Sequence, residues 1–446
     1  MDTLKQWLKK QKGGGKPALI LLIQGYLFLT VLCFIILALP FNKSTSISLI
    51  DQIFLASSIV STTGLSPLDF GQSLTFYGQL SALFFIQLGG IGYMALCSFI
   101  ILKDSPNLPK ISVSLLRLEF NLPERYPLLS FIYSVFSFTI LIELIGAIVL
   151  YFGFKEANVE QPLWSAIFHS VSAFCTAGFS LFSDSMTPFK NNSLITNTIL
   201  ILSILGSVGF IVLLDFWLKI IGKRKQVTLT SKIILISTFG YILIGTVLLY
   251  FSDGLLISEG FQGIQSSLFQ LVSAHTTVGF NNYPIENIKF GGLLILIIIM
   301  VIGASPAGTG GGIKTTSITA LIGLLYSILK KRNHITFFKK EIPDKKIYLA
   351  ISASVFYTVI LLFAVWVLVQ IDGSKFGFEE LLFEAASALS TVGLSTGITS
   401  ELSDMNKIII SILMFIGRIG VMTFGFALIS QSPIMRSKPK VEDIAV

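Results

Sequence analysis

The sequence predicts an all-α polytopic membrane protein with eight transmembrane helices arranged in four parallel repeats. Three observations support this fold class: a low content of charge, apolar stretches long enough to cross a bilayer, and a short motif that occurs four times. Of the 446 residues, 53% are hydrophobic and 13% are charged, which is about half the charge of an average soluble domain. The composition therefore argues against a soluble protein.

The apolar residues form long stretches, for example 18–41, 126–154, 233–251 and 347–371. A helix needs about 20 apolar residues to cross the hydrocarbon core, and we count eight such stretches with shorter apolar segments between them. The first stretch is too long for a secretory signal and has no small-residue cleavage site before the next segment. We therefore expect it to be the first membrane helix.

Basic residues predict the orientation of the chain. With eight spans, both termini lie on one side of the membrane, and 24 of the 32 Lys and Arg residues lie on that side against 6 on the other. Basic loops stay in the cytoplasm, so both termini are predicted to be cytoplasmic in a multi-pass protein of the cell membrane. The net charge of +8 is then a topology signal and no sign of nucleic-acid binding.

One motif occurs four times: Phe, three residues, Ser, three residues, Thr, one residue, Gly. The copies are Phe54-Ser58-Thr62-Gly64, Phe168-Ser172-Thr176-Gly178, Phe269-Ser273-Thr277-Gly279 and Phe383-Ser387-Thr391-Gly393. Their glycines are separated by 114, 101 and 114 residues. Each copy is too short to cross a bilayer and lies between two long spans. The predicted unit is a helix, a half-crossing pore helix, an extended stretch and a second helix.

Four such units, all entering from the cytoplasmic side, are expected to surround one central pore. The predicted boundaries are a cytoplasmic N-terminus at 1–16, repeats at 17–125, 126–228, 229–344 and 345–432, and a cytoplasmic tail at 433–446. Parallel units of this kind differ from the inverted repeats of many secondary transporters.

The end of each motif suits a cation filter. Backbone without helical hydrogen bonds is tolerated at membrane depth only where it is buried in protein or lines water, and glycine allows successive carbonyls to point to one side. Four such strands make rings of oxygen atoms that replace water around a dehydrated cation. The Phe and Ser positions are expected to hold each pore helix against its neighbours. The candidate ion-binding residues are Thr62, Thr63, Gly64, Thr176, Ala177, Gly178, Thr277, Val278, Gly279, Thr391, Val392 and Gly393.

The four motifs resemble those of the Trk/Ktr/HKT superfamily of potassium transporters, over essentially the whole chain. The resemblance rests on single-glycine filters, whereas the Gly-Tyr-Gly signature of tetrameric potassium channels is absent. With one span before the first filter, the chain is most similar to the membrane (pore) subunit of a bacterial Ktr potassium uptake system. The resemblance implies potassium uptake, a homodimer in membrane lipid, and a separate cytosolic ring of nucleotide-binding regulatory subunits.

A glycine-rich segment interrupts the span after the third motif, at 303–316, between apolar half-helices at about 291–302 and 318–329. In relatives the matching loop lies in the membrane below the filter and acts as a gate. The resemblance thus implies a gating role for Gly308, Gly310, Gly311, Gly312 and Lys314. The segment also nearly matches a phosphate-binding P-loop, but Ile313 stands where glycine is required and no strand precedes it.

Arg418 lies within the last apolar span. A charge at bilayer depth costs at least about 2.5 kcal/mol, so it normally faces water or a partner. The resemblance implies a positive barrier in the permeation path beneath the filter. The alternative is a helix-stabilising pair with a carboxylate or with loop carbonyls, and the two roles can coexist.

Two rival functions are considered. An intramembrane enzyme would need polar catalytic pairs at a shared depth, and the sequence offers none; His169 and His275 fall at different repeat positions. A sodium-selective or sodium-coupled carrier of the same fold stays open, with sodium also possible as an activator. In related plant proteins, serine at the first filter position accompanies sodium preference, and here that position is Gly64, which favours potassium.

Overall fold

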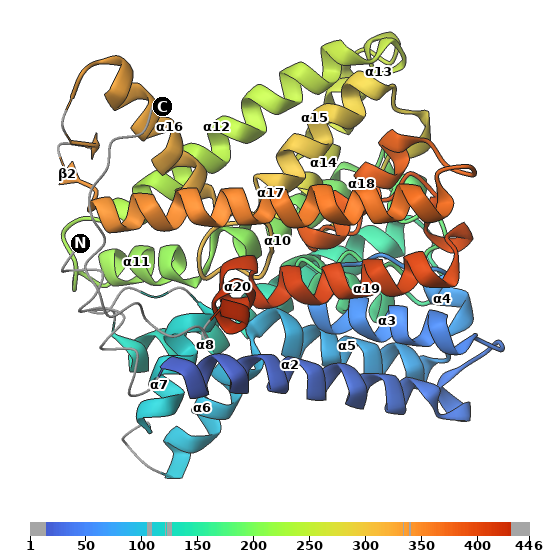
Figure 1. The fold of residues 1–446 in the computed structure, drawn as a ribbon. Helices are drawn as coiled ribbons and strands as arrows, with labels where there is room; N and C mark the ends of the chain where they lie inside the picture. Colours follow the sequence, from blue (N-terminus) through green and yellow to red (C-terminus); the bar gives the residue numbers. More distant parts are fainter. Residues whose placement is uncertain are drawn as a thin grey trace.

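The computed structural model describes residues 15–104, 109–120, 122, 127–332, 334–338 and 340–429. Most of the predicted cytoplasmic N-terminus (1–16) and all of the predicted tail (433–446) lie outside these ranges. The described chain is almost entirely helical (Figure 1).

The helices follow the order that the sequence predicts, with a long helix before each motif and further helices after it. The first predicted repeat contains α2 (Gly15–Ala38), η1 (Pro40–Asn42), pore helix α3 (Leu49–Ser61), α4 (Phe70–Ser73), α5 (Phe76–Ile91), α6 (Tyr93–Asp104) and α7 (Lys110–Glu119). The second contains α8 (Leu128–Glu156), pore helix α9 (Pro162–Phe174), η2 (Thr187–Phe189), α10 (Ser193–Val208) and α11 (Phe210–Ile220).

The second half of the chain repeats this order. The third predicted repeat contains α12 (Leu229–Ser252), α13 (Gly254–Ser258), pore helix α14 (Phe261–Thr276), η3 (Ile285–Asn287), α15 (Phe290–Val301), α16 (Thr315–Leu329) and the paired strands β1 (Thr336–Phe337) and β2 (Lys340–Glu341). The fourth contains α17 (Asp344–Asp372), pore helix α18 (Phe378–Leu389), η4 (Ile398–Glu401), α19 (Asp404–Ile419) and α20 (Val421–Ile429). The short antiparallel pair β1–β2 departs from the all-α prediction.

Short polar side chains begin the helix that follows three of the four motifs. Thr75 accepts a hydrogen bond from the backbone of Gly78 at the start of α5, and Asn192 and Ser403 act in the same way at the starts of α10 and α19. Such caps satisfy backbone N–H groups that have no partner in the first helical turn. They fix where each chain segment turns back toward the core.

The helices after the first, second and fourth motifs are broken at a glycine, and the sequence predicted an interruption only after the third motif. The pair α5–α6 is bent by 83° and α10–α11 by 93°, and the breaks fall at Gly92 and Gly209, with φ of +86° and +92°; Gly420 between α19 and α20 has φ of +92°. Glycine adopts this backbone conformation without a Cβ penalty. In the described residues, four single helices can span a membrane, or six spans if each bent pair counts as one. The count of eight stays a prediction.

The four units close into a cycle. The helix after each motif packs against the pore helix of the next unit: α5 on α9, α10 on α14, α15 on α18, and α19 back on α3. Ser57 of α3 donates a hydrogen bond to the Ser411 carbonyl at 3.0 Å. Lys407 of α19 forms an ion pair with Asp51 of α3 at 2.8 Å. The end of the chain is thereby joined to its beginning.

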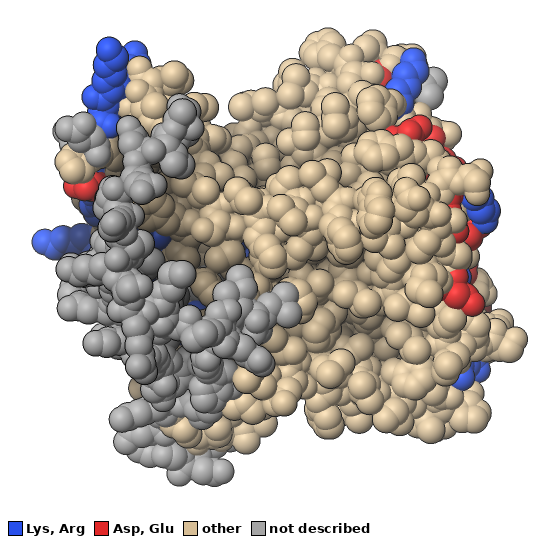
Figure 2. Space-filling view, viewed as in Figure 1, with Lys and Arg blue, Asp and Glu red and all other residues tan. Residues whose placement is uncertain are grey.

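The outer surface is apolar across a broad band. Figure 2 shows charged side chains at the two ends of the molecule and a wide uncharged zone between them. Large side chains of the outer helices are exposed there, such as Ile140 of α8 and Leu243 of α12, which are 65% and 68% exposed. Exposed apolar area on this scale marks contact with lipid or with another protein, which agrees with the membrane class that the composition predicts.

Candidate functional site: four glycine turns closed into a ring

Each pore helix ends at a threonine in the left-handed conformation. The φ angles are 52°, 50°, 59° and 51° at Thr62, Thr176, Thr277 and Thr391. The next residue donates its N–H to the serine carbonyl five positions earlier, as in Thr63 to Ser58 at 2.9 Å and Val392 to Ser387 at 2.8 Å. This is the hydrogen bond of a Schellman helix end, where glycine is usual. A β-branched residue at positive φ is uncommon, so four such threonines point to a shared requirement.

The four motif glycines lie against one another in a closed ring. A Cβ atom on Gly64 would lie 2.5 Å from the carbonyl oxygen of Ala177. Cβ atoms on Gly178, Gly279 and Gly393 would likewise lie 2.1 Å from the carbonyl oxygens of Val278, Val392 and Thr63, respectively. These separations are far shorter than any real Cβ contact, so side chains are excluded at all four positions. Four backbone carbonyls and four glycines therefore share one small central space.

The motif serines attach the turns to their pore helices. Ser58 and Ser387 accept hydrogen bonds from the N–H groups of Gly64 and Gly393, at 3.1 and 3.0 Å. Ser172 and Ser273 instead donate to the carbonyls of Phe179 and Phe280, at 2.9 and 2.6 Å. The sequence predicted that these serines would bind neighbouring helices, and their partners are the backbone of their own turns.

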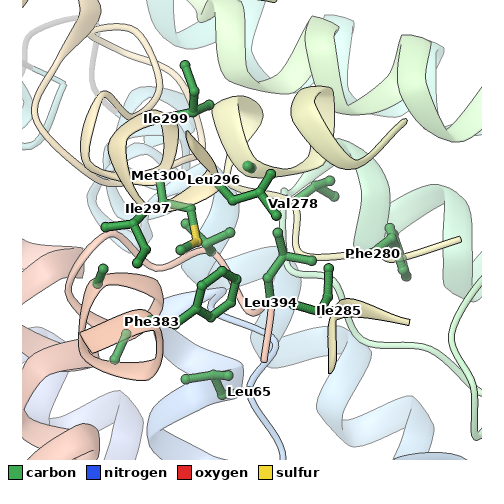
Figure 3. Close-up of a cluster of buried hydrophobic side chains, with 14 of the residues drawn as sticks. Leu65, Val278, Phe280, Ile285, Leu296, Ile297, Ile299, Met300, Phe383 and Leu394 are labelled. Carbon is green, nitrogen blue, oxygen red and sulfur yellow. The ribbon is translucent and has the colours of Figure 1, made fainter. Parts of the chain in front are cut away.

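An apolar residue follows each motif glycine, and its buried side chain holds the turn in place. Leu65, Phe179, Phe280 and Leu394 are all at most 1% exposed. Figure 3 shows Leu65, Phe280 and Leu394 within a cluster of buried side chains that includes Phe383 of α18 and Met300 of α15. Because the side chains are held in this core, the backbone of each turn is left to face the central space.

The glycine-rich segment lies against the threonine ends of the pore helices. Thr176 Oγ1 donates to Thr309 Oγ1 at 2.9 Å, and the N–H of Gly311 donates to Thr277 Oγ1 at 3.3 Å. A Cβ on Gly310 would lie 2.1 Å from Thr277 Oγ1, and one on Gly311 would lie 2.5 Å from Thr391 Oγ1. Residues 309–311 thus contact three of the four threonines directly.

Arg418 reaches the fourth threonine and the loop together. Its guanidinium donates to Thr62 Oγ1 at 2.9 Å and also to the carbonyls of Thr309 and Gly89. The side chain therefore binds a loop carbonyl, as the stabilising alternative predicts, and its role as a barrier to ions stays a prediction. Lys314 adds a second cation, with Nζ 2.7 Å from the Gly310 carbonyl.

The remaining glycines of the predicted gate shape the loop. Gly312 has φ of +73°, and a Cβ atom on it would lie 2.7 Å from the Cα of Gly303. A Cβ on Gly308 would lie 2.4 Å from the Ser207 carbonyl of α10. The loop also forms backbone hydrogen bonds across this contact, from Ser305 to Ser207 at 3.1 Å and from Thr309 to Gly206 at 3.2 Å. The segment is therefore fitted closely between α10 and the pore helices.

Sequence reasoning missed a second set of glycines. Gly89, Gly206 and Gly417 each lie where a Cβ would meet a pore-helix carbonyl, of Val60, Phe174 and Leu389, at 2.3, 1.9 and 2.2 Å. Each stands three residues before the glycine that breaks its helix. The signal was present as Gly-x-x-Gly in the helices after motifs one, two and four, and aligning those helices would have found it.

The other intramembrane polar residues are held by structural partners. Glu143 accepts hydrogen bonds from Gln87 with both oxygens, at 3.0 and 3.1 Å. His169 Nδ1 lies 2.7 Å from the Ser165 carbonyl, and His275 Nδ1 lies 3.2 Å from that of Ile302. Within the described ranges no three His, Cys, Asp or Glu side chains gather in a way that could hold a metal ion.

Comparison with known proteins agrees with this geometry. A family model described as "TrkH: Cation transport protein" matches residues 20–434. The chain belongs to the TrkH family. The Ktr system potassium uptake protein B of Vibrio alginolyticus is 32% identical over 435 residues, which cover 96% of this chain and 94% of that protein. The potassium/sodium uptake protein NtpJ of Enterococcus hirae is 31% identical over 427 residues, which cover 92% of each chain.

A solved structure supports the fold. The potassium transporter TrkH from Vibrio parahaemolyticus aligns with a TM-score of 0.68 at 20% identity, over 92% of this chain and 85% of that one. The chain is therefore a helical membrane protein with a TrkH-like fold, and its family comprises transporters rather than enzymes. The resemblance to the Trk and Ktr transporters that the motifs predict is confirmed.

Proposed function

We propose that this member of the TrkH family carries potassium into the cell through the ring of glycine turns. The observation that carries the proposal is the closed relation between each motif glycine and the next carbonyl, at Thr63, Ala177, Val278 and Val392. Rings of backbone carbonyls replace the hydration shell of a dehydrated cation. The printed names of the relatives, two potassium uptake proteins among them, support potassium as that cation.

In this proposal the filter comprises the Thr, the following residue and the Gly of each motif. The serine hydrogen bonds and the buried side chains after each glycine keep the carbonyls at a fixed spacing. Inward flux follows the membrane potential, which is worth about 2.3 kcal/mol per elementary charge for each 100 mV.

The loop 303–316 is the proposed gate. In the described arrangement residues 309–311 fill the space next to the threonines, and Arg418 and Lys314 bind loop carbonyls. Conduction then requires that the loop leave the threonines. The cationic side chains add an electrostatic barrier to a potassium ion as long as they stay there.

The remaining features of the proposal rest on the family. We place the chain in the cell membrane with both termini in the cytoplasm, as a homodimer that works with a cytosolic ring of nucleotide-binding subunits. Two relatives named for a Ktr system support the expectation of partner subunits. The printed name of NtpJ includes sodium, so sodium is tested as competitor and as activator.

Uptake of radioactive rubidium into liposomes that hold the purified protein tests the function. Excess unlabelled potassium outside the vesicles is expected to block uptake, and the same concentration of sodium is expected to leave it unchanged. Equal block by both ions would overturn potassium selectivity, and flux that starts only when sodium is added would favour the sodium-coupled alternative.

A further inference from the structure

Glu119, the last residue of α7, has a buried carboxylate at the break between α5 and α6. A Cβ on Gly92 would lie 2.9 to 3.1 Å from the three outer atoms of the Glu119 side chain. The hydroxyl of Tyr26 in α2 donates to Glu119 Oε1 at 3.1 Å. Among the described residues Oε2 is buried without a hydrogen-bond partner. A buried acceptor left in this way destabilises the structure unless it gains a donor.

The guanidinium of Arg418 lies close to this carboxylate. Arg418 donates to the carbonyls of Gly89 and Gly90 at the end of α5, and Glu119 contacts Gly92 two residues further on. Tyr26 interacts electrostatically with both charged groups. Arg418 Nε is likewise buried with no hydrogen-bond partner in the described part of the chain. An unpaired donor and an unpaired acceptor of opposite charge therefore lie near each other.

Opening of the gate would remove one of the hydrogen-bond acceptors of the Arg418 guanidinium. If the loop leaves the threonines, the hydrogen bond from Arg418 to the Thr309 carbonyl is lost. Arg418 keeps its hydrogen bonds to Thr62, Gly89 and Gly90, but its buried charge then has one acceptor fewer and no carboxylate partner among the described residues. The carboxylate of Glu143, which lies beside Gln87 of α5, has both oxygens bound by that side chain. Among the buried acidic side chains that the structure describes, Glu119 is the one with an oxygen that has no hydrogen-bond partner.

We propose that Glu119 is a positioning residue for the gate, which binds the Arg418 guanidinium through Oε2 when the loop 303–316 clears the pore. The inference rests on the proposed gating function of that loop. It makes Arg418 a side chain with two alternative partners, the Thr309 carbonyl when the pore is blocked and Glu119 when it is open. It also connects the gate to α7, which lies outside the long apolar helices, so a shift of α7 changes the stability of the open state.

The same contact predicts a dependence on pH. Burial raises the pKa of Glu119 to about 7, while the charge of Arg418, the Tyr26 hydroxyl and the backbone of Met94 oppose the shift. Among the described residues, the titratable and charged groups that face this carboxyl are Tyr26, Tyr93, Cys97 and Arg418, with Arg117 on its own helix. A raised pKa means that the carboxylate is ionised above pH 7 and neutral below it. The ionised carboxylate accepts much stronger hydrogen bonds from a guanidinium than the neutral acid does, so uptake is expected to fall as the pH on the α7 side drops below about 7.

The test measures initial rubidium uptake by the full-length protein and by Glu119→Gln, Arg418→Gln and the double variant. Glu119→Gln is expected to lower the rate about tenfold, which equals about 1.4 kcal/mol of lost preference for the open state. Arg418→Gln is expected to raise it, because the loop loses a contact. In the double variant the Glu119 change is expected to have no further effect. Equal effects of Glu119→Gln with and without Arg418 would overturn the inference, because a purely structural role at the start of α6 does not depend on Arg418.

Controls separate this inference from the proposed function. Glu341→Gln removes an exposed carboxylate in β2 (side chain 57% exposed) and is expected to leave uptake unchanged. Glu119→Asp keeps the charge and is expected to recover part of the rate. Block by potassium is expected to be the same in every variant. If potassium block fails in the unmodified protein, the proposed function is wrong; if it holds while the two substitutions are additive, only the role of Glu119 is wrong.

The pH dependence of uptake supplies a second measurement. Rubidium uptake is recorded with the pH on the α7 side set between about 6 and 8. A rate that falls below pH 7 in the unmodified protein and not in Arg418→Gln supports the inference, and a fall of the same size in both proteins would overturn it. A flat profile in the unmodified protein would overturn it.

Discussion

Replacing Gly279 with Ser tests the ring where it is most tightly closed. The new Cβ would lie 2.1 Å from the Val392 oxygen, 3.0 Å from the Gly393 Cα and 3.0 Å from the Val392 carbonyl carbon. All three are backbone atoms, so no side-chain rotation relieves the contact. Because real Cβ atoms stay at least 3.0 Å from such neighbours, the oxygen must move by about 0.9 Å.

The displaced carbonyl is one of the four proposed ion ligands. A contact between a carbonyl and a charged group is worth about 1.5–3 kcal/mol, so its loss is expected to weaken potassium binding by about 10- to 100-fold. The φ of +81° at this position adds about 1–2 kcal/mol of strain. The expected result is a rise in the potassium concentration needed to block rubidium uptake, together with a lower melting temperature.

The matched control is Gly240→Ser in α12. A Cβ on Gly240 would meet no heavy atom within 4 Å, so the same change of residue is expected to leave both potassium block and melting temperature as they are. Wild-type potassium affinity in a correctly folded Gly279→Ser protein would refute the assignment of the ring as the filter.

Three further predictions follow from the contacts of the site. Deleting Gly310 and Gly311 is expected to raise initial rubidium uptake, because the loop then no longer reaches Thr277 and Thr391; a slower rate in folded protein would contradict the gate. Ser387→Ala leaves the N–H of Gly393 without its acceptor. The turn is expected to lose about 1–3 kcal/mol of stability, which is measured as weaker block of rubidium uptake by potassium. Ser354→Ala on α17 is the control outside the ring. Lys407→Met removes the ion-pair partner of Asp51 at the junction of α19 and α3. Because Asp51 is partly exposed, the expected loss of stability in thermal unfolding is about 1–2 kcal/mol. Altered potassium selectivity would argue against a purely structural junction.

Much of the fold follows from local patterns in the sequence. The long helices α2, α8, α12 and α17 are visible as apolar stretches. The four pore helices and their turns are visible as a repeat, because every unit needs the same serine, threonine and glycine to end a helix and release its carbonyls. The family resemblance follows from the same residues.

The breaks in the second helices could not be predicted from hydropathy. A single glycine such as Gly92 or Gly209 leaves the mean hydropathy of a span unchanged, although its positive φ turns the chain by 83° or 93°. The hydrogen-bond partners of Thr309 and Arg418 also could not be predicted, because they lie on segments more than 100 residues away in the sequence. The role of the motif serines was misjudged for a different reason: helical spacing indicates a face, and these serines bind backbone beyond the end of their own helix.

The join between the last unit and the first has a consequence for how the protein is made. Ser57 and Ser411 are separated by 354 residues, and Asp51 and Lys407 by 356. At a synthesis rate of about 5–20 residues per second, roughly 20 to 70 s pass between the appearance of the two halves of this contact. Throughout that interval α3 lies in the membrane with a carboxylate and hydroxyl groups that have not met their partners. Biogenesis of the chain therefore depends on whatever covers that face until α19 arrives, and substitutions there are expected to lower yield before they alter transport.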